Sequence, residues 1–330
     1  MTVPGARPLA RFTDEELQVM LRSAGRAPSV HNTQPWEFVV SRTRIDLYAD
    51  PRRQLRRADP TGRSLLVSCG AALFNLRVAA EQLGFRPRVR RLPDRDAPTL
   101  VASLAFDHRL HDPGDLAELY PAVELRRTNR LPFEERPVED ALVSRLCHEA
   151  ALENAMLRVY SDPDEVLRLV KLVHDADSRM HADPAVTAER AGWIHRGGRD
   201  DGIPASALGP RPEQVHMPFR DLAAGPDPGR ENARFERTPT IAVLSTRHDT
   251  VTDWVRAGEA LERVLLAATT AGLSASFVNQ PLEIEELRWL VRSPMTGIGH
   301  PQMVMRVGYG RPVPPTPRRP LEDLFRVHPD

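Results

Sequence analysis

A short loop near the N-terminus concentrates the first candidate chemistry within the ten residues Ala27–Trp36 (APSVHNTQPW). Pro28 ends the helical pattern before it, and a strand pattern starts at Trp36. Between them lie the hydroxyl and amide groups of Ser29, Asn32, Thr33 and Gln34. A rigid loop at a helix end, with such side chains and exposed backbone N–H groups, can hydrogen-bond the edge of a flat ring. The same residues also suit a capped helix end followed by a tryptophan-anchored hairpin, and spacing alone favours that interpretation.

An arginine cluster at Arg126–Arg130 (RRTNR) provides the second candidate. Two adjacent arginines are followed by a third, four residues after the first, and Thr128 adds a hydroxyl between them. Planar guanidinium groups hold phosphate through paired hydrogen bonds, so the cluster suits a phosphate or an electron-rich ring edge. In an arginine-rich protein, a solvated run of charges is the plainer alternative.

Two later segments carry weaker candidates. The segment Leu273–Gln280 (LSASFVNQ) has the pattern of a strand, and its polar side chains are candidate ligand contacts. A buried strand with a polar exit explains the same pattern equally well. Its polar side chains include Ser274, Ser276 and Asn279. A proline-rich tail follows Gly308–Pro312 and carries the adjacent pair Arg318 and Arg319.

The spacing of apolar residues predicts the helices and strands that would position these segments. Thr13 and Glu16 form a capping box at the start of the first helix, and Gly84 ends a long second one. Helices are predicted at about 13–27, 62–83, 116–126, 138–150, 163–180, 251–271 and 284–291. Strands are predicted at about 37–41, 44–48, near 89, 100–106, 157–160, 241–245, 274–278 and 303–307.

The two long helical patterns form an internal repeat. The run from Gly70 (GAALFNLRVAAEQLGF) aligns without gaps with the run from Gly258 (GEALERVLLAATTAGL), so that Gly84 falls on Gly272. A shared amphipathic pattern accounts for part of the identity, but both glycines and the following strand also agree. The preceding helices at 15–26 and 139–149 pair as well. The sequence therefore predicts two tandem units, at 1–115 and 116–330.

A segment dense in glycine, proline and charge, about 197–237, lengthens the second unit. Connections this long are usually lids or disordered linkers. The composition alone fits a disordered insert as well as it fits a lid.

Composition excludes several functional classes. The chain has 45 basic and 45 acidic residues, and this net charge of zero gives no case for a nucleic-acid or membrane partner. Cys69 and Cys147 form neither a disulfide framework nor a CxxC pair. The first twelve residues lack the apolar stretch of a signal peptide, and no run approaches the roughly 20 apolar residues of a membrane span. A cytoplasmic protein without a metal site is expected.

The loop Ala27–Trp36 resembles the segment APS-x-x-N-x-QPW of the nitroreductase family. Arg126–Arg130 is similar to that family's N-terminal R-R-S-x-R motif, with Thr128 in place of the serine. Gly308–Pro312 and its basic tail resemble the family's closing strand. The resemblance covers most of the chain, except the segment near 200–237. It implies FMN at an interface between two units, one giving arginines to the phosphate and the other giving the loop beside the ring.

The resemblance also implies individual contacts. Those to the flavin ring come from the loop, namely Pro28, Ser29, His31 and Asn32, with Gln34 a weaker candidate. Those to the phosphate come from the arginine motif, in which the first arginine reaches the ring: Arg126, Arg127, Thr128 and Arg130. The late basic residue that returns to the phosphate corresponds to Arg318 or Arg319. The strand near the flavin N5 edge corresponds to Ser274, Ser276 and Asn279.

The two motifs lie in different units of this chain. The first unit has no RR-x-x-R before its first helix, and the second passes from helix to strand without an SxxNTQPW loop. We therefore expect a single-chain pseudo-dimer with one complete FMN site, monomeric in solution and similar to a fused two-repeat actinobacterial subgroup. The implied fold is α+β, in which each unit has a central, mostly antiparallel sheet flanked by helices.

The family mechanism implies ping-pong hydride transfer from NAD(P)H through flavin N5 to a nitroaromatic or quinone-like acceptor. The chemistry belongs to the flavin, so no catalytic acid or base is expected. A second hypothesis is an FMN-sequestering protein whose lid prevents turnover. A third is a flavin-free scaffold.

Overall fold

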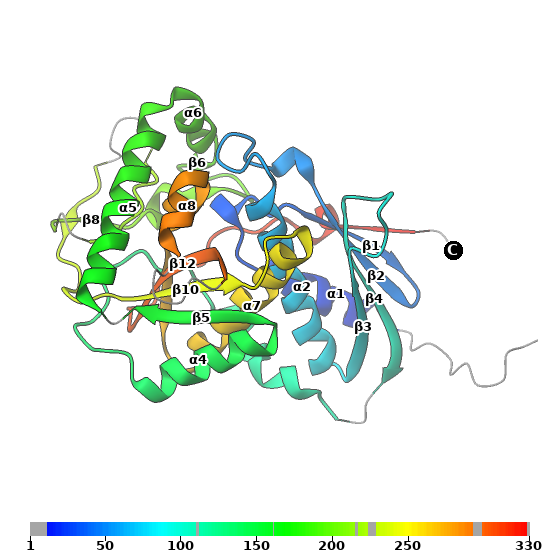
Figure 1. Ribbon diagram of the computed structural model, residues 1–330. Coiled ribbons are helices and arrows are strands. Elements are labelled where there is room, and N and C mark those ends of the chain that lie inside the picture. Colours follow the sequence, from blue (N-terminus) through cyan, green and yellow to red (C-terminus); the bar gives the residue numbers. More distant parts are fainter. Residues whose placement is uncertain are drawn as a thin grey trace, which may run out of the picture.

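The computed structural model describes residues 12–109, 112–160, 162–214, 217–223, 229–292 and 299–328. The expectation that there is no signal peptide rests on the first twelve residues, nearly all of which lie outside these ranges. The structure has an α+β fold with two separate sheets and a layer of helices between them (Figure 1).

The first sheet is built mainly from the N-terminal part of the chain. Its own elements are α1 (Asp14–Gly25), η1 (Val30–Asn32), β1 (Trp36–Ser41), β2 (Arg44–Ala49), η2 (Pro51–Arg53), α2 (Arg63–Gln82), β3 (Phe85–Arg91) and β4 (Leu100–Arg109). The strand order is β13-β1-β2-β4-β3, where β13 (Phe325–Val327) runs parallel to β1 and the other pairs are antiparallel. α1 starts at the predicted capping box of Thr13 and Glu16.

The second sheet is antiparallel and has the order β11-β12-β10-β5. Its elements are η3 (Asp115–Leu119), α3 (Tyr120–Leu125), α4 (Asp140–Leu152), β5 (Ala155–Tyr160), α5 (Pro163–Ala182), α6 (Pro184–Gly192), β10 (Thr240–Thr246), α7 (Val251–Thr270), β11 (Ser274–Phe277), η5 (Gln280–Glu283), α8 (Glu285–Val291) and β12 (His300–Gly308). Between α6 and β10 the chain forms only short pieces, β6 (Ile194–His195), β7 (Ile203–Pro204), η4 (Ala205–Ala207), β8 (Arg211–Pro212) and β9 (Asn232–Ala233).

The two sheets share one strand order. Numbered within its own unit, β1-β2-β4-β3 corresponds to β5-β10-β12-β11, with α2 and α7 in the same place after the second strand. Gly84 and Gly272, which the sequence alignment pairs, both follow their helix in the left-handed region, with φ of 78° and 74°. The extra length of the second unit lies between β5 and β10, where the first unit has a tight hairpin.

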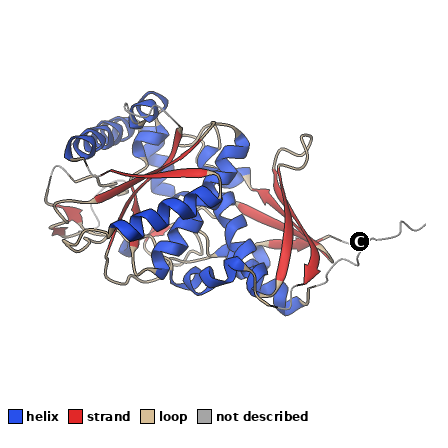
Figure 2. Ribbon diagram, turned by 60° about the horizontal axis from the view of Figure 1, so that its bottom comes forward, coloured by secondary structure: helices blue, strands red, loops and turns tan. Residues whose placement is uncertain are grey.

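Helices α2 and α7 pack against each other (Figure 1), and Figure 2 shows the helices lying between the two large sheets. They meet at Gly70 and Gly258, where a Cβ on Gly70 would lie 2.1 Å from the Val255 carbonyl oxygen. A Cβ on Gly258 would lie 2.0 Å from the carbonyl oxygen of Val67. Each glycine thus faces the backbone three residues before the other, so the contact is reciprocal and leaves no room for a side chain.

By length and composition α2 could cross a membrane, yet most of it is buried inside the protein as the central core helix.

The structure differs from the predicted elements in two respects. The helix predicted at 116–126 is split into η3 and α3, because Pro121 at the start of α3 cannot continue a helix from the preceding turn. Among the α-helices and the strands of three or more residues, α6 and β13 were not predicted.

Candidate active site

Two adjoining cavities lie where the loop after α1, the segment after α3, the 197–237 segment and the C-terminal tail meet. The first has a volume of about 190 Å³ and the second about 80 Å³. Both are lined by Pro28, Ser29, Thr128 and Arg130, so they form one composite site. Residues from both halves of the chain are needed to build it.

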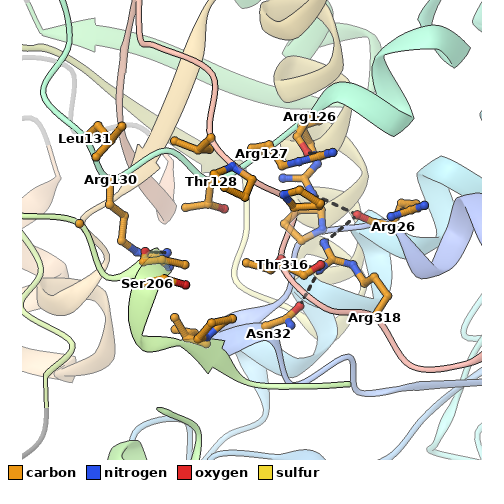
Figure 3. A pocket seen from close by; sticks show the side chains of 18 of the residues that line it. Arg26, Asn32, Arg126, Arg127, Thr128, Arg130, Leu131, Ser206, Thr316 and Arg318 are labelled. Atoms are coloured by element: carbon orange, nitrogen blue, oxygen red, sulfur yellow. Dashed lines mark hydrogen bonds between the residues drawn. The ribbon is translucent and has the colours of Figure 1, made fainter. Parts of the chain in front are cut away.

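Four arginines from three separate segments gather at one end of the first cavity: Arg26, Arg126, Arg127 and Arg318 (Figure 3). The guanidinium groups of Arg126 and Arg318 both donate to the Arg26 carbonyl oxygen, at 3.0 and 3.1 Å. Burial lowers the pKa of Arg318 to about 9, and repulsion from Arg126, Arg26 and Arg127 adds to this effect.

The cluster has little negative charge to balance it. The carboxylate of Glu262 is completely buried, with Oε1 3.3 Å from Nε of Arg126. Glu124 pairs with Arg26 at 3.0 Å, but its side chain is 58% exposed and the pair is therefore weak. Among the described residues, the Nε–H groups of Arg126, Arg127 and Arg318 are buried without a hydrogen-bond partner. This donor set suits a multiply charged anion such as a phosphate.

The loop after α1 has an unusual backbone. His31, Asn32 and Gln34 have φ of 46°, 56° and 49°, a region that side chains other than glycine adopt only when surrounding contacts hold them there. Ser29 Oγ accepts from the Gln34 N–H at 2.9 Å, and Ser68 Oγ accepts from the Val30 N–H at 3.2 Å. These bonds fix the loop against the start of α2.

Asn32 connects the loop to two other segments. Its amide donates to the carbonyl oxygens of Gly202 at 2.9 Å and Pro317 at 3.0 Å. Its side-chain oxygen accepts from Arg318 at 3.0 Å. All of its amide groups therefore have protein partners, and Asn32 lines the first cavity while holding the lid and the tail in place.

The second cavity has apolar walls and a polar end. The walls are the buried or half-buried side chains of Val67, Leu261, Phe277 and Met303. At the polar end, His31 lies against Arg220, with Nε2 of the ring 3.4 Å from a guanidinium nitrogen. Burial and the nearby Arg220, Arg190 and Arg130 hold the pKa of His31 well below its usual value.

The tautomer of His31 follows from this contact. An arginine can only donate, so Nε2 must accept and the proton of the neutral ring sits on Nδ1. Nδ1 is buried without a partner in the part of the chain that the structure describes. His31, a wall residue of the second cavity, therefore has a buried N–H donor without a partner among the described residues.

The described part of the 197–237 segment, which we call the lid, lies against the two cavities and is held there by side-chain contacts. Arg130 donates to the Ala207 carbonyl oxygen at 2.9 Å, and Gln34 donates to the Asp200 carbonyl oxygen at 2.8 Å. Arg53 pairs with Asp201 at 2.8 Å. Farther along, Arg220 forms a buried ion pair with Glu283. A second guanidinium nitrogen of Arg220 lies 2.8 Å from Oε2 of Glu283. These contacts hold the described residues of the segment beside the two cavities.

The structure brings ten of the fourteen predicted cofactor contacts to the walls of these cavities. They are Pro28, Ser29, His31, Asn32, Arg126, Arg127, Thr128, Arg130, Asn279 and Arg318. The four that do not line either cavity are Gln34, Ser274, Ser276 and Arg319.

Those four side chains have other surroundings. Gln34 accepts from the Arg319 backbone N–H at 2.8 Å, and Arg319 donates to the carbonyl oxygens of Gln34 and Trp36. Ser274 accepts from Asn129 at 3.3 Å, and Ser276 is buried within β11. Gln34 and Arg319 thus join the tail to the first sheet, and we leave all four out of the proposed site.

Several wall residues were not predicted from the sequence. Arg26 directly precedes the polar loop, and its charge beside that motif was an available signal. Leu261 belongs to an ordinary amphipathic helix, as does Glu262 behind the wall, and Arg220 lies in a segment without periodicity, so nothing local distinguishes them.

Comparison with known proteins relates this chain to one family. A family model described as Nitroreductase family matches residues 199–309. A Mycobacterium tuberculosis protein provisionally named NAD(P)H nitroreductase Rv3131 is 36% identical over 333 residues, covering 98% of this chain and 95% of that protein. Another from the same organism, provisionally named NAD(P)H nitroreductase acg, is 32% identical over 335 residues, covering 97% and 98%. A solved nitroreductase with bound FMN from Desulfitobacterium hafniense is 14% identical, covers 62% of this chain and 95% of that one, and has a TM-score of 0.37.

Proposed function

The chain belongs to the nitroreductase family, and on that premise we propose that it binds one FMN in the joined cavities and oxidises NAD(P)H. The electrons would pass to a small acceptor of the nitroaromatic or quinone type. The observation that carries the proposal is the arginine cluster at the first cavity, with three buried, unpartnered Nε–H groups among the described residues.

The described residues fit both ends of FMN. The phosphate matches Arg126, Arg127 and Arg318, which have more positive charge than nearby carboxylates balance. The ring matches the second cavity, whose walls include apolar side chains and His31 with its unpartnered N–H donor. When bound, FMN supplies the hydride chemistry through its N5.

The protein's part is to position and stabilise charge. Arg130 and Arg220 line the ring end of the site and can stabilise negative charge that develops there. His31 stays neutral and donates a hydrogen bond, because its pKa lies well below its usual value. The lid residues Ile203, Pro204 and Ala207 line the first cavity and would limit the access of water to it.

We further propose that the chain is a fused pseudo-dimer with one site. The shared strand order and the reciprocal contact of Gly70 and Gly258 support two units related by an approximate two-fold axis. At the position equivalent to Glu262, the first unit has the buried Phe74, flanked by Arg77 and Arg263 at 5.2 and 5.9 Å from its ring centroid.

Around Phe74, the position equivalent to Glu262, positive and negative side chains balance each other. Three arginines pair with three glutamates at 2.5–3.0 Å: Arg77, Arg91 and Arg263 with Glu149, Glu153 and Glu259. A site for a phosphate would need surplus positive charge, which this network does not provide. We therefore expect one FMN per chain.

The lid favours a second candidate function, sequestration of FMN without turnover. Its backbone is tied to Asn32, Gln34 and Arg130, which lie in or beside the site, and the Arg220–Glu283 pair anchors it. A lid that stays closed would keep a nicotinamide away from the ring.

One experiment separates these functions. The flavin-loaded protein is mixed anaerobically with NADH or NADPH, and the flavin absorbance is followed. Rapid bleaching supports the reductase and rules out sequestration, whereas a spectrum that does not change rules out the reductase. Protein that is colourless and takes up no FMN on titration contradicts both.

A further inference from the structure

Glu262 is a buried carboxylate directly behind the arginine cluster. It lies on α7, and its exposed fraction is zero. Nε of Arg126 is 3.3 Å from Oε1, but no hydrogen bond forms between them. Among the described residues neither oxygen of Glu262 accepts a hydrogen bond of good geometry, and the nearby amide of Asn75 offers only a weak contact, so the carboxylate is poorly stabilised for a buried charge.

The groups that face Glu262 come from three segments. Arg126 follows α3, Arg318 comes from the tail, and the uncharged amide of Asn75 comes from α2. Arg26 and Arg127 complete the positive cluster beyond them. Burial raises the pKa of Glu262 to about 7, although Arg126, Asn75 and Arg318 act in the opposite direction.

The carboxylate is not required by the packing of the two central helices. The residue in the equivalent position of α2 is Phe74, which is also completely buried. An apolar side chain therefore fills the equivalent position in the other unit. This difference associates Glu262 with the arginine cluster and with whatever that cluster binds.

We propose that Glu262 is the internal counter-charge of the cluster, and that binding of a phosphate monoester in the first cavity is coupled to uptake of one proton by Glu262. This inference rests on the proposed function, since it assigns the cluster to the phosphate of FMN. A phosphate brings its own negative charge to Arg126 and Arg318, so a second negative charge behind them becomes unfavourable. The proton comes from solvent and ends on a Glu262 oxygen.

The coupling predicts the direction of the pH dependence. Below about pH 7 Glu262 is largely neutral in the free protein, so binding takes up no further proton there. Above that pH each binding event requires a proton, and FMN affinity falls by up to tenfold per pH unit. Arg318, with a pKa of about 9, limits the useful range at the alkaline end.

The test compares the wild-type protein with Glu262→Gln between pH 7 and 8.5, using FMN as the probe and flavin fluorescence as the readout. The wild-type Kd should rise about tenfold or more over this interval. The Glu262→Gln variant, which mimics the neutral acid, should show a nearly flat profile and bind FMN more tightly than wild type at pH 8.5. Glu118→Gln, at an exposed position that lines neither cavity, should follow the wild type.

Calorimetry keeps the inference testable even if Glu262→Gln fails to fold. The heat of FMN binding to wild type at pH 8 should differ between buffers of different protonation enthalpy, by the amount expected for uptake of close to one proton. FMN binding without proton uptake, or the same pH profile in wild type and Glu262→Gln, overturns the inference and leaves the FMN site standing. Failure of the wild type to bind FMN overturns the proposed function together with it.

Discussion

At the scale of single residues, the adjacent arginines of the tail have opposite roles. Arg318 lines the first cavity and bonds to the backbone of Arg26 and to Asn32. Arg319 turns away and donates to the carbonyl oxygens of Gln34 and Trp36. Neighbouring side chains of an extended chain point to opposite sides, which explains the difference.

Arg318→Gln should therefore weaken FMN binding about 10- to 100-fold, because one charge-assisted contact to the phosphate, worth about 1.5–3 kcal/mol, is lost. Riboflavin, which has no phosphate, should bind both proteins alike. Fluorescence titration with the two flavins measures both values.

The matched control is Arg319→Gln, which should lower the melting temperature because it frees the tail, while leaving the Kd for FMN within about twofold. A loss of FMN affinity in Arg319→Gln as large as in Arg318→Gln would contradict the assignment.

The two arginines could not be distinguished from the sequence. Their pattern predicted a basic tail near the phosphate, but the side each faces depends on where β13 pairs with β1, a contact between distant parts of the chain. The loop was easier to predict, because its polar residues are contiguous. Its left-handed backbone and the contact of His31 with Arg220, 189 residues away, could not be read from local spacing.

At the scale of elements, the lid is held by a few specific contacts. The strongest is the Arg220–Glu283 pair, in which both side chains are less than 10% exposed. Arg199 pairs with Asp201 on the surface of the same segment at 2.8 Å. Removing one partner of a buried pair leaves an uncompensated charge, whereas an exposed pair contributes little.

Arg220→Gln should release the lid, because loss of one partner of the buried pair destabilises the closed position by about 3–5 kcal/mol. Limited proteolysis should then cut within 197–214 much faster than in wild type, and bound FMN should dissociate faster. Arg199→Gln should change both rates by less than about threefold. Equal proteolysis of the wild type and Arg220→Gln would show that other contacts hold the lid.

The C-terminal strand is a second element with a clear energetic role. Leu324 precedes β13, is 3% exposed and belongs to the core of the first unit. Leu324→Ala should reduce the free energy of unfolding in urea by about 2–4 kcal/mol. Val327→Ala, at a position 66% exposed, should change it by less than about 0.5 kcal/mol.

Elements with long periodic patterns were predictable, and those fixed by distant partners were not. The predicted strands at 241–245 and 303–307 lie within β10 and β12, and the helix predicted at 251–271 matches α7. β13 has only three residues, too few for a periodic pattern, and exists because β1 offers it an edge.

At the scale of the whole molecule, the crossing of α2 and α7 joins the two units. Gly70→Ala and Gly258→Ala each place a methyl group about 2 Å from a carbonyl oxygen of the opposite helix. Each should destabilise the protein by about 1–3 kcal/mol or more, and by similar amounts, because the contacts are reciprocal.

Thermal unfolding of both variants tests this, with Gly192→Ala as the control. Gly192 ends α6, and no neighbour lies within 4 Å of the place that a methyl group would take there, so the substitution should be neutral or slightly stabilising. A strong effect from only one of the two central glycines would argue against an approximate two-fold axis.

The path of the tail also has a consequence for synthesis of the protein. One stretch of chain supplies both Arg318 to the cavity and β13 to the exposed edge of β1 (Figure 1). On the ribosome β1 is made long before β13, so its outer edge stays unpaired until residues 325–327 have been translated, on the order of tens of seconds later. An unpaired edge strand is a template for association with other chains. Nascent chains of this protein should therefore need protection by chaperones until β13 has paired with β1.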